Sequence, residues 1–189
     1  MFKRRRGSGR GKWGLIGGAI AGGATLIPLI PVIRKRAMRV TTILKKDHRM
    51  VHGMITTLQM TPRFNGMVRK TLLERIHHEV NVHAQAEEEI LYPAMRNFMF
   101  IEGQSKVDEA YREHQQIKDL LNDLATMDPV SDAFDVKFAE FKNKIDHHVH
   151  EEEGEMFEIL KQRMSTDEQE ELGRRIHERK MDLKRRQAA

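Results

Sequence analysis

Two stretches of this chain, HAQAEEEILYP at residues 83–93 and HVHEEEGEMFE at residues 148–158, contain the same pattern. In the first, His83 is followed four residues later by Glu87, and the second stretch repeats that spacing. Because four residues make about one helical turn, the histidine and the glutamate lie on the same face of a helix. If that face also carries the apolar residues, burying the carboxylate requires a compensating partner.

The spacing of apolar residues predicts four long amphipathic helices. The first ends before Pro62, the second covers about 65–97, the third covers about 105–126, and the fourth begins at Ser131 or Asp132. Four such helices joined by short loops predict an all-α fold, an antiparallel up-down four-helix bundle. A capped start near Ser165 predicts a further, polar helix at the C-terminus.

Each expected inner face is apolar except for histidines and glutamates. The apolar positions are Leu44, Val51, Ile55 and Leu58; Leu73, Ile76, Val80, Ile90 or Leu91, and Ala94; Val107, Ala110, Ile117, Leu121 and Leu124; and Phe138, Phe141, Ile145, Met156 and Ile159. The polar positions on the same faces are His48, His83, Glu87, His114, His148 and Glu152. All four helices therefore direct ionisable side chains inward.

These polar positions repeat along the chain, since His48 precedes His83 by 35 residues and His114 precedes His148 by 34. Two helical hairpins related by a pseudo-two-fold axis would bring the four imidazoles and two carboxylates together. Hydrogen bonds or protonated His–Glu pairs could offset part of the cost of burial. However, two unpaired buried carboxylates would each cost several kcal/mol out of a total stability of about 5–15 kcal/mol. A pair of metal ions would satisfy every group.

The donor atoms narrow the choice of metal. The chain has no cysteine, so nitrogen and oxygen ligands without sulfur argue against copper(I) and structural zinc. Iron, manganese and zinc pairs remain. A ferritin-like site needs two Glu-x-x-His motifs, and only Glu74 and His77 form one here, which disfavours that architecture.

Four motifs together resemble the hemerythrin-type HHE cation-binding domain over about residues 38–162. They are DHRMVHG at 47–53, HAQAEEEILYP, EHQQIKDLL at 113–121, and HVHEEEGEMF. The resemblance implies a bundle holding two non-haem iron ions, with or without an oxo bridge, that binds dioxygen or responds to oxygen, nitric oxide or iron. Manganese and zinc are the less favoured metals. By position, the resemblance assigns the metal ligands as His48, His83, Glu87, His114, His148 and Glu152, with His52 and Glu153 as further candidates.

The chain departs from oxygen-carrying hemerythrins at two places. Those proteins have a second histidine one turn after the third-helix histidine, where this chain has Lys118, and the missing imidazole argues against reversible oxygen carriage. Their last carboxylate lies five residues after its histidine, which is the position of Glu153.

Since no separate acid, base or nucleophile motif is present, we expect a binding protein with no enzymatic activity. A di-iron enzyme that reduces peroxide or nitric oxide, and a metal-free structural bundle, are the alternatives.

The basic charge belongs to the N-terminal segment. Twelve lysines and arginines precede the first acidic residue, Asp47, and the whole chain has a formal charge of +5, so the remainder carries about −7. An acidic body disfavours a nucleic-acid partner. We therefore divide the chain into a basic and apolar segment at 1–36, a metal-binding domain at 37–164 and a basic C-terminal helix at 165–189.

Residues 13–33 contain no charged side chain and, as a helix, would span roughly 31 Å, which predicts a membrane anchor. Glycines four residues apart in this segment would allow a homo-oligomer to form through it. The expected localisation is therefore membrane-associated, with the metal domain in the cytoplasm. A half-inserted or interfacial segment and an export signal are the alternatives.

Overall fold

The computed structural model describes residues 38–98 and 101–187, and every regular element in these ranges is helical, which confirms the all-α prediction. The proposed N-terminal segment, 1–36, lies outside the described residues. The elements are α2 (Val40–Met60), α3 (Gly66–Ala86), the π-helical segment η1 (Glu87–Leu91), α4 (Tyr92–Phe98), α5 (Ile101–Thr126), α6 (Asp132–Glu151), the π-helical segment η2 (Glu152–Met156), α7 (Phe157–Arg163) and α8 (Thr166–Gln187).

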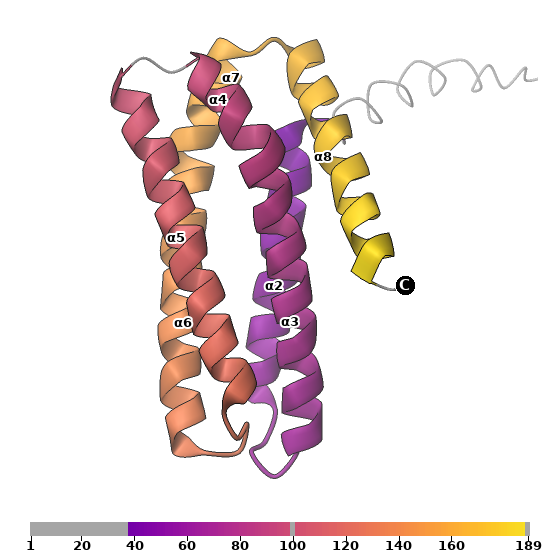
Figure 1. Cartoon of the computed structure of the whole chain (residues 1–189), viewed down its shortest axis with the longest axis vertical. Coiled ribbons are helices and arrows are strands. Elements are labelled where there is room, and N and C mark those ends of the chain that lie inside the picture. The colour runs from indigo at the N-terminus through magenta and orange to yellow at the C-terminus, as the bar shows by residue number, and fades with distance from the viewer. Residues whose placement is uncertain (1–37, 99–100, 188–189) are drawn as a thin grey trace, which may run out of the picture.

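Helices α2, α3, α5 and α6 lie side by side along the long axis of the molecule (Figure 1). The turns that join α2 to α3 and α5 to α6 lie at the same end (Figure 1). The two hairpins contact each other through α3 and α5, and α8 packs along α2 and α3. The described residues thus form two helical hairpins with an additional helix on the first hairpin.

Side-chain caps fix two of the helix starts where the sequence predicts them. The Ser131 hydroxyl accepts a hydrogen bond from the backbone N–H of Phe134 at 3.1 Å, which satisfies an otherwise free donor in the first turn of α6. At α8 the bonding is reciprocal: the backbone N–H of Glu168 donates to the Ser165 hydroxyl, and the backbone N–H of Ser165 donates to the Glu168 carboxylate. This capping box explains why the chain turns sharply into α8.

The apolar interior consists of two clusters, and the inward histidines and glutamates lie between them. One cluster contains Val40, Leu44, Leu91, Tyr92, Val107, Ala110, Met156, Phe157, Leu172 and Ile176, among others. The other contains Val51, Ile55, Leu58, Leu73, Ile76, Val80, Ile117, Leu121, Leu124, Phe134, Phe138, Phe141 and Ile145. Each of the four long helices, together with the helical segments that continue it, carries residues of the first cluster on one side of its inward histidine and residues of the second cluster on the other side. The polar groups therefore form one layer across the molecule.

The π-helical segments change the buried face beyond the polar layer. At the end of η1 and beyond it, Leu91 and Met95 are buried, whereas Ile90 and Ala94 are half-buried. After η2, Leu160 is buried in place of the predicted Ile159, which is half-buried. Because a π-helical turn contains one more residue than an α-helical turn, each segment rotates the following stripe by about one position. The predicted stripes are correct up to each glutamate. Beyond it, Met156 and Leu91 are buried as predicted, whereas the predicted Ala94 and Ile159 are only half-buried.

Helix α8 is closely attached to the first hairpin. Leu172 and Ile176 belong to the same apolar cluster as the start of α2. A Cβ atom built on Gly173 would lie 2.0 Å from the backbone oxygen of Met38 and 2.8 Å from the backbone nitrogen of Val40. Only glycine allows the two backbones to approach this closely.

The predicted membrane association requires correction. Within residues 38–98 and 101–187, no helix is both long enough and apolar enough to cross a bilayer. The long helices in these ranges are amphipathic, because each turns one apolar face toward its neighbours and carries charged residues on the other faces. Residues 13–33, which suggested both the anchor and the homo-oligomer, lie outside the described residues. The expectation of a membrane-associated protein is withdrawn.

Candidate metal centre

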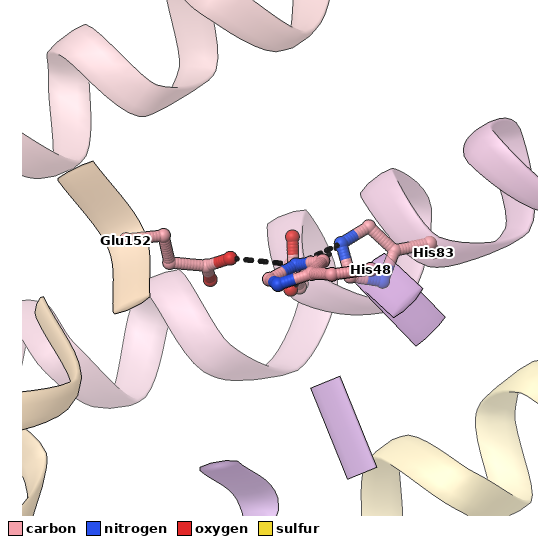
Figure 2. A group of neighbouring side chains, drawn as sticks. His48, His83 and Glu152 are labelled. Carbon is pink, nitrogen blue, oxygen red and sulfur yellow. Dashed lines mark hydrogen bonds and ion pairs between the residues drawn. The ribbon is translucent and has the colours of Figure 1, made fainter. Parts of the chain in front are cut away.

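The polar layer brings together the six side chains that the sequence places on the inner faces. In the first hairpin, the Nε2 atoms of His48 and His83 lie 3.2 Å apart. His48 Nε2 is also 3.1 Å from Glu152 Oε2, so the His48 ring lies between His83 and Glu152 (Figure 2). His83 Nε2 is 3.1 Å from Glu87 Oε1. All four of these side chains are buried.

The second hairpin repeats the imidazole pair. The Nε2 atoms of His114 and His148 lie 3.1 Å apart, and His114 Nε2 is 3.4 Å from Glu87 Oε2. Glu87 therefore directs one oxygen toward each hairpin. Two groups of potential metal ligands result, in each of which the ligand atoms lie within 4.8 Å of one another: His48, His83, Glu87 and Glu152 in one, and Glu87, His114 and His148 in the other.

A carboxylate outside the layer contacts the remaining nitrogen of each imidazole. The four Nδ1 contacts are His48 to Glu153 at 2.9 Å, His83 to Asp47 at 3.4 Å, His114 to Glu88 at 3.0 Å and His148 to Glu113 at 3.0 Å. Because an ionised carboxylate can only accept, each Nδ1 atom donates its N–H outward. In the neutral ring the lone pair is then on Nε2, which points to the centre of the layer. This His–carboxylate pairing is the arrangement that orients histidine ligands in metal sites.

The inner carboxylates fit a bound cation. Both oxygens of Glu87 and both oxygens of Glu152 are buried, and none has a hydrogen-bond partner of suitable geometry among the described residues. Burial and the negative charge of the adjacent Glu152 raise the pKa of Glu87 well above its ordinary value. Burial alone would also raise the pKa of Glu152, but the close, positively charged His48 ring outweighs burial and lowers it to about 2. Without a cation nearby, ionisation of Glu87 is therefore disfavoured, and a bound cation would favour the ionised form of both groups.

The imidazoles respond to the same environment. Burial lowers the pKa of His83, and it lowers the pKa of His114 to about 4, so both rings are neutral at pH 7. Burial also acts to lower the pKa of His48, but Glu152 and Glu153 outweigh it and raise that pKa. In the metal-free protein, a proton on His48 thus partly neutralises the inner carboxylates. The donor set of neutral imidazoles and carboxylates fits iron, manganese or zinc.

The sequence model of the hemerythrin HHE cation binding domain matches residues 39–160 of this chain. The chain belongs to this family. A hemerythrin HHE cation binding domain-containing protein from Mycobacterium kansasii has a crystal structure with a TM-score of 0.68 at 23% identity, covering 77% of this chain and 86% of that one. Its fold is therefore shared with this chain.

Two further relatives are similar in sequence. A DNA nickase from Nostoc sp. is 26% identical over 179 residues, and the match covers 94% of this chain but only 50% of the nickase. An uncharacterized hemerythrin-like protein from Schizosaccharomyces pombe is 21% identical over 139 residues, which are 74% of this chain and 68% of that protein. The chain thus spans half the length of the nickase that it resembles.

Each π-helical segment of the hemerythrin domain begins at an inner glutamate. The backbone N–H of Tyr92 bonds to the carbonyl of Glu87, and that of Phe157 bonds to the carbonyl of Glu152, each across five residues. A π-helical turn widens the helix locally and is frequently found at functional sites. Here it occurs at the same place in both hairpins, directly where the buried carboxylates project.

The two further candidate metal ligands, His52 and Glu153, lie outside the inner layer. The His52 side chain is 38% exposed, and its Nε2 atom is 3.4 Å from Asp146. Glu153 is half-buried and contacts the outward nitrogen of His48, so it orients an imidazole and lies outside both groups of ligand atoms. That the six inner residues ligate metal in this hemerythrin domain remains a prediction.

Sequence reasoning missed the role of Glu88, which contacts Nδ1 of His114, and the roles of a matched pair of acids, Asp47 and Glu113. Each directly precedes the first histidine of its hairpin, and each contacts the outward nitrogen of the second histidine. The sequence pattern that could have revealed the roles of this pair is an acidic residue directly before a histidine, which occurs in both halves of the chain. Tyr92 was also missed: its hydroxyl lies 3.1 Å from His114 Nε2 and is fully buried.

An apolar cavity of about 20 Å³ adjoins the layer on the side of the second apolar cluster. Its lining repeats in the two hairpins and comprises His48, Val51, Val80, His83, Ala84, His114, Ile117, Ile145, His148 and Val149. A space of this size holds one small molecule, and an apolar cavity is not favourable for water. His48 and Val149 also line an open groove on the surface, so they separate the cavity from solvent.

We predict that Glu87→Gln will abolish metal binding while leaving the metal-free fold about as stable as the wild type. The raised pKa of Glu87 favours its neutral form in the metal-free protein, and the amide is a neutral group of the same shape. The free energies of unfolding of the metal-free proteins should therefore agree within about 1 kcal/mol. Metal analysis and thermal unfolding, each with and without metal, provide the measurements.

Glu153→Ala serves as the matched comparison. Loss of a carboxylate that orients a histidine ligand typically weakens metal affinity by about 10–100-fold, so this variant should still bind metal at high concentration. If Glu153→Ala abolished binding while Glu152→Ala retained it, the inner and outer assignments on this helix would have to be exchanged.

Proposed function

We propose that this chain holds two iron ions in a hemerythrin-type four-helix bundle and binds or senses a small diatomic molecule, dioxygen or nitric oxide. The observation that carries the proposal is the position of Glu87, whose two oxygens face the two groups of potential ligands. One carboxylate between two such groups suits two adjacent cations. His48, His83 and Glu152 would hold one ion, His114 and His148 would hold the other, and Glu87 would bridge them.

Iron at these positions would supply one-electron redox chemistry and affinity for diatomic molecules. The protein side chains provide the remaining requirements. The outer carboxylates orient the imidazoles, the apolar clusters exclude water, and the inner carboxylates balance charge. The cavity beside the four imidazoles is large enough for one small molecule and has no ionisable wall other than the histidines. These features support binding of a small uncharged ligand.

The residues around the cavity favour a binding function over a catalytic one. The ionisable side chains nearest to it are the proposed metal ligands themselves, and the remaining lining is aliphatic. Turnover of peroxide or nitric oxide would require a proton donor within reach of the bound molecule. Tyr92, whose hydroxyl lies 3.1 Å from His114 Nε2, is one such group, but burial and the surrounding carboxylates raise its pKa well above the ordinary value, which makes it a poor proton donor.

We predict that the purified full-length protein contains about two iron atoms per chain after aerobic expression with iron supplied. The six inward ligands exceed the three that commonly hold a mononuclear iron site. Elemental analysis normalised to protein concentration is the measurement. A folded protein with no bound metal would disprove the metal-binding proposal, and a single iron atom would disprove the dinuclear one.

We further predict that Val149→Ala increases the association rate of nitric oxide with the reduced iron-loaded protein severalfold. Val149 separates the surface groove from the cavity, so its truncation should open the shorter path. Stopped-flow absorbance gives the rate. Val136→Ala is the matched control, because this residue lies in the same helix and is 72% exposed. An unchanged rate in Val149→Ala would mean that the ligand reaches the cavity elsewhere.

Action on DNA is a second candidate function, and the likeness to the Nostoc nickase is the observation that favours it. The match covers 94% of this chain and therefore reaches into residues 1–37, which carry nine lysines and arginines and no acid. Such a segment could contact phosphates. If this second function were correct, the prediction from the acidic body of the chain, that nucleic acid is not a partner, would be wrong.

A supercoiled plasmid tests the second candidate. If the chain nicks DNA through its metal centre, full-length protein should convert the plasmid to open circles, and both a chelator and Glu87→Gln should prevent the conversion. Intact plasmid at low salt would remove this candidate. Nicking that persists in Glu87→Gln would show that the metal centre is not responsible.

A further inference from the structure

Each of the four carboxylates that orient a histidine also lies close to a lysine. Glu88 accepts a hydrogen bond from Lys118 at 2.7 Å, and Glu153 lies 2.8 Å from Lys45. Glu113 lies 3.8 Å from Lys144, and Asp47 accepts a hydrogen bond from Lys180. Four chains of imidazole, carboxylate and ammonium therefore lead outward from the polar layer.

Lys180 differs from the other three lysines in origin and burial. It comes from α8, whereas the others come from the helices that carry the histidines. Its side chain is 10% exposed, compared with 24% for Lys118, 30% for Lys144 and 35% for Lys45. Its partner Asp47 is buried as well. The ammonium also bonds to the same oxygen, Oδ2, that faces Nδ1 of His83.

Burial decides how strongly each lysine acts. Charges near the surface are screened by water and salt, whereas the same charges in the interior interact several-fold more strongly. An ammonium bonded to the Asp47 carboxylate withdraws negative charge from the oxygen that accepts the His83 N–H. The His83 ring is then a weaker donor to whatever its Nε2 atom binds.

We propose that Lys180 is a positioning residue for the metal centre: through Asp47 it weakens the donor strength of His83 and raises the reduction potential of the adjacent metal position. The inference rests on the proposed function, because it requires iron at that position. It gives α8 a role in the chemistry of the hemerythrin domain, although the family match ends at residue 160. It also makes the two metal positions inequivalent, because no buried lysine among the described residues occupies the corresponding place at Glu113.

The test compares reduction potentials of the full-length iron-loaded protein by spectroelectrochemistry. Lys180→Met should shift the reduction equilibrium toward the oxidised form by about tenfold, or about 59 mV for one electron. Lys118→Met and Lys45→Met should give smaller shifts. Lys184→Met is the matched control, because Lys184 lies one turn further along α8 and bonds Glu79, which contacts no histidine of the layer.

A double-mutant cycle with Asp47→Asn separates action through the carboxylate from a direct field effect. If Lys180 acts through Asp47, Lys180→Met should shift the potential in the wild type but cause no further shift in Asp47→Asn. An equal shift in both backgrounds, or a shift in Lys184→Met as large as that in Lys180→Met, would overturn the inference.

Iron analysis and thermal unfolding of each sample complete the design. Absence of iron from the wild type would overturn this inference together with the proposed function, whereas bound iron with an unshifted potential would overturn this inference alone. Should Lys180→Met unfold, Lys180→Arg retains the charge and Asp47→Asn removes the carboxylate. A potential that is unchanged in Lys180→Arg and altered in Asp47→Asn would then support the inference, and the reverse result would overturn it.

Discussion

Two fully buried carboxylates lie among four imidazoles, and the remaining structure depends on how their charge is compensated. An isolated ionised carboxylate in a protein interior costs several kcal/mol, a large part of the total stability of a domain. In the metal-free protein the raised pKa of Glu87 favours its neutral form, and the raised pKa of His48 favours a positive charge beside Glu152, so both shifts offset part of that cost. Bound cations would meet it fully. The two apolar clusters on either side keep the layer dry, so the same packing that stabilises the fold makes the site attractive to a cation.

Much of this arrangement could be predicted because helical periodicity and chemistry agree. In four successive helices, a stripe of aliphatic residues is interrupted once by His or by His and Glu. This pattern predicts one buried polar layer across a four-helix bundle. The interruption falls at the same height in every helix because 34 or 35 residues separate the two histidines of each hairpin. The six inner residues and the predicted stripes before Glu87 and Glu152 followed from spacing alone.

Other features could not be predicted because their causes are not local. The π-helical segments depend on a widened turn that no residue type specifies, so Ile159 was placed inside although Leu160 is buried. The orienting role of Asp47 depends on contact with a helix 36 residues away. Glu153 matched the spacing of a known ligand, and only the helix rotation at η2 shows that it faces the outer nitrogen of His48. The membrane prediction rested on composition in a segment that the described fold does not include.

The symmetry of the two hairpins is broken from outside by α8. Gly173 allows the α8 backbone to approach the start of α2, where any side chain would collide with backbone atoms of residues 38–40. Lys180 lies two turns after Gly173, and Asp47 lies two turns after Val40, so the close approach at one level fixes the distance between the two side chains at the next. A duplicated set of inward histidines thus acquires two different environments from the packing of one added helix. The proposed difference between the two metal positions would therefore depend on the backbone contact at Gly173 as much as on the lysine itself.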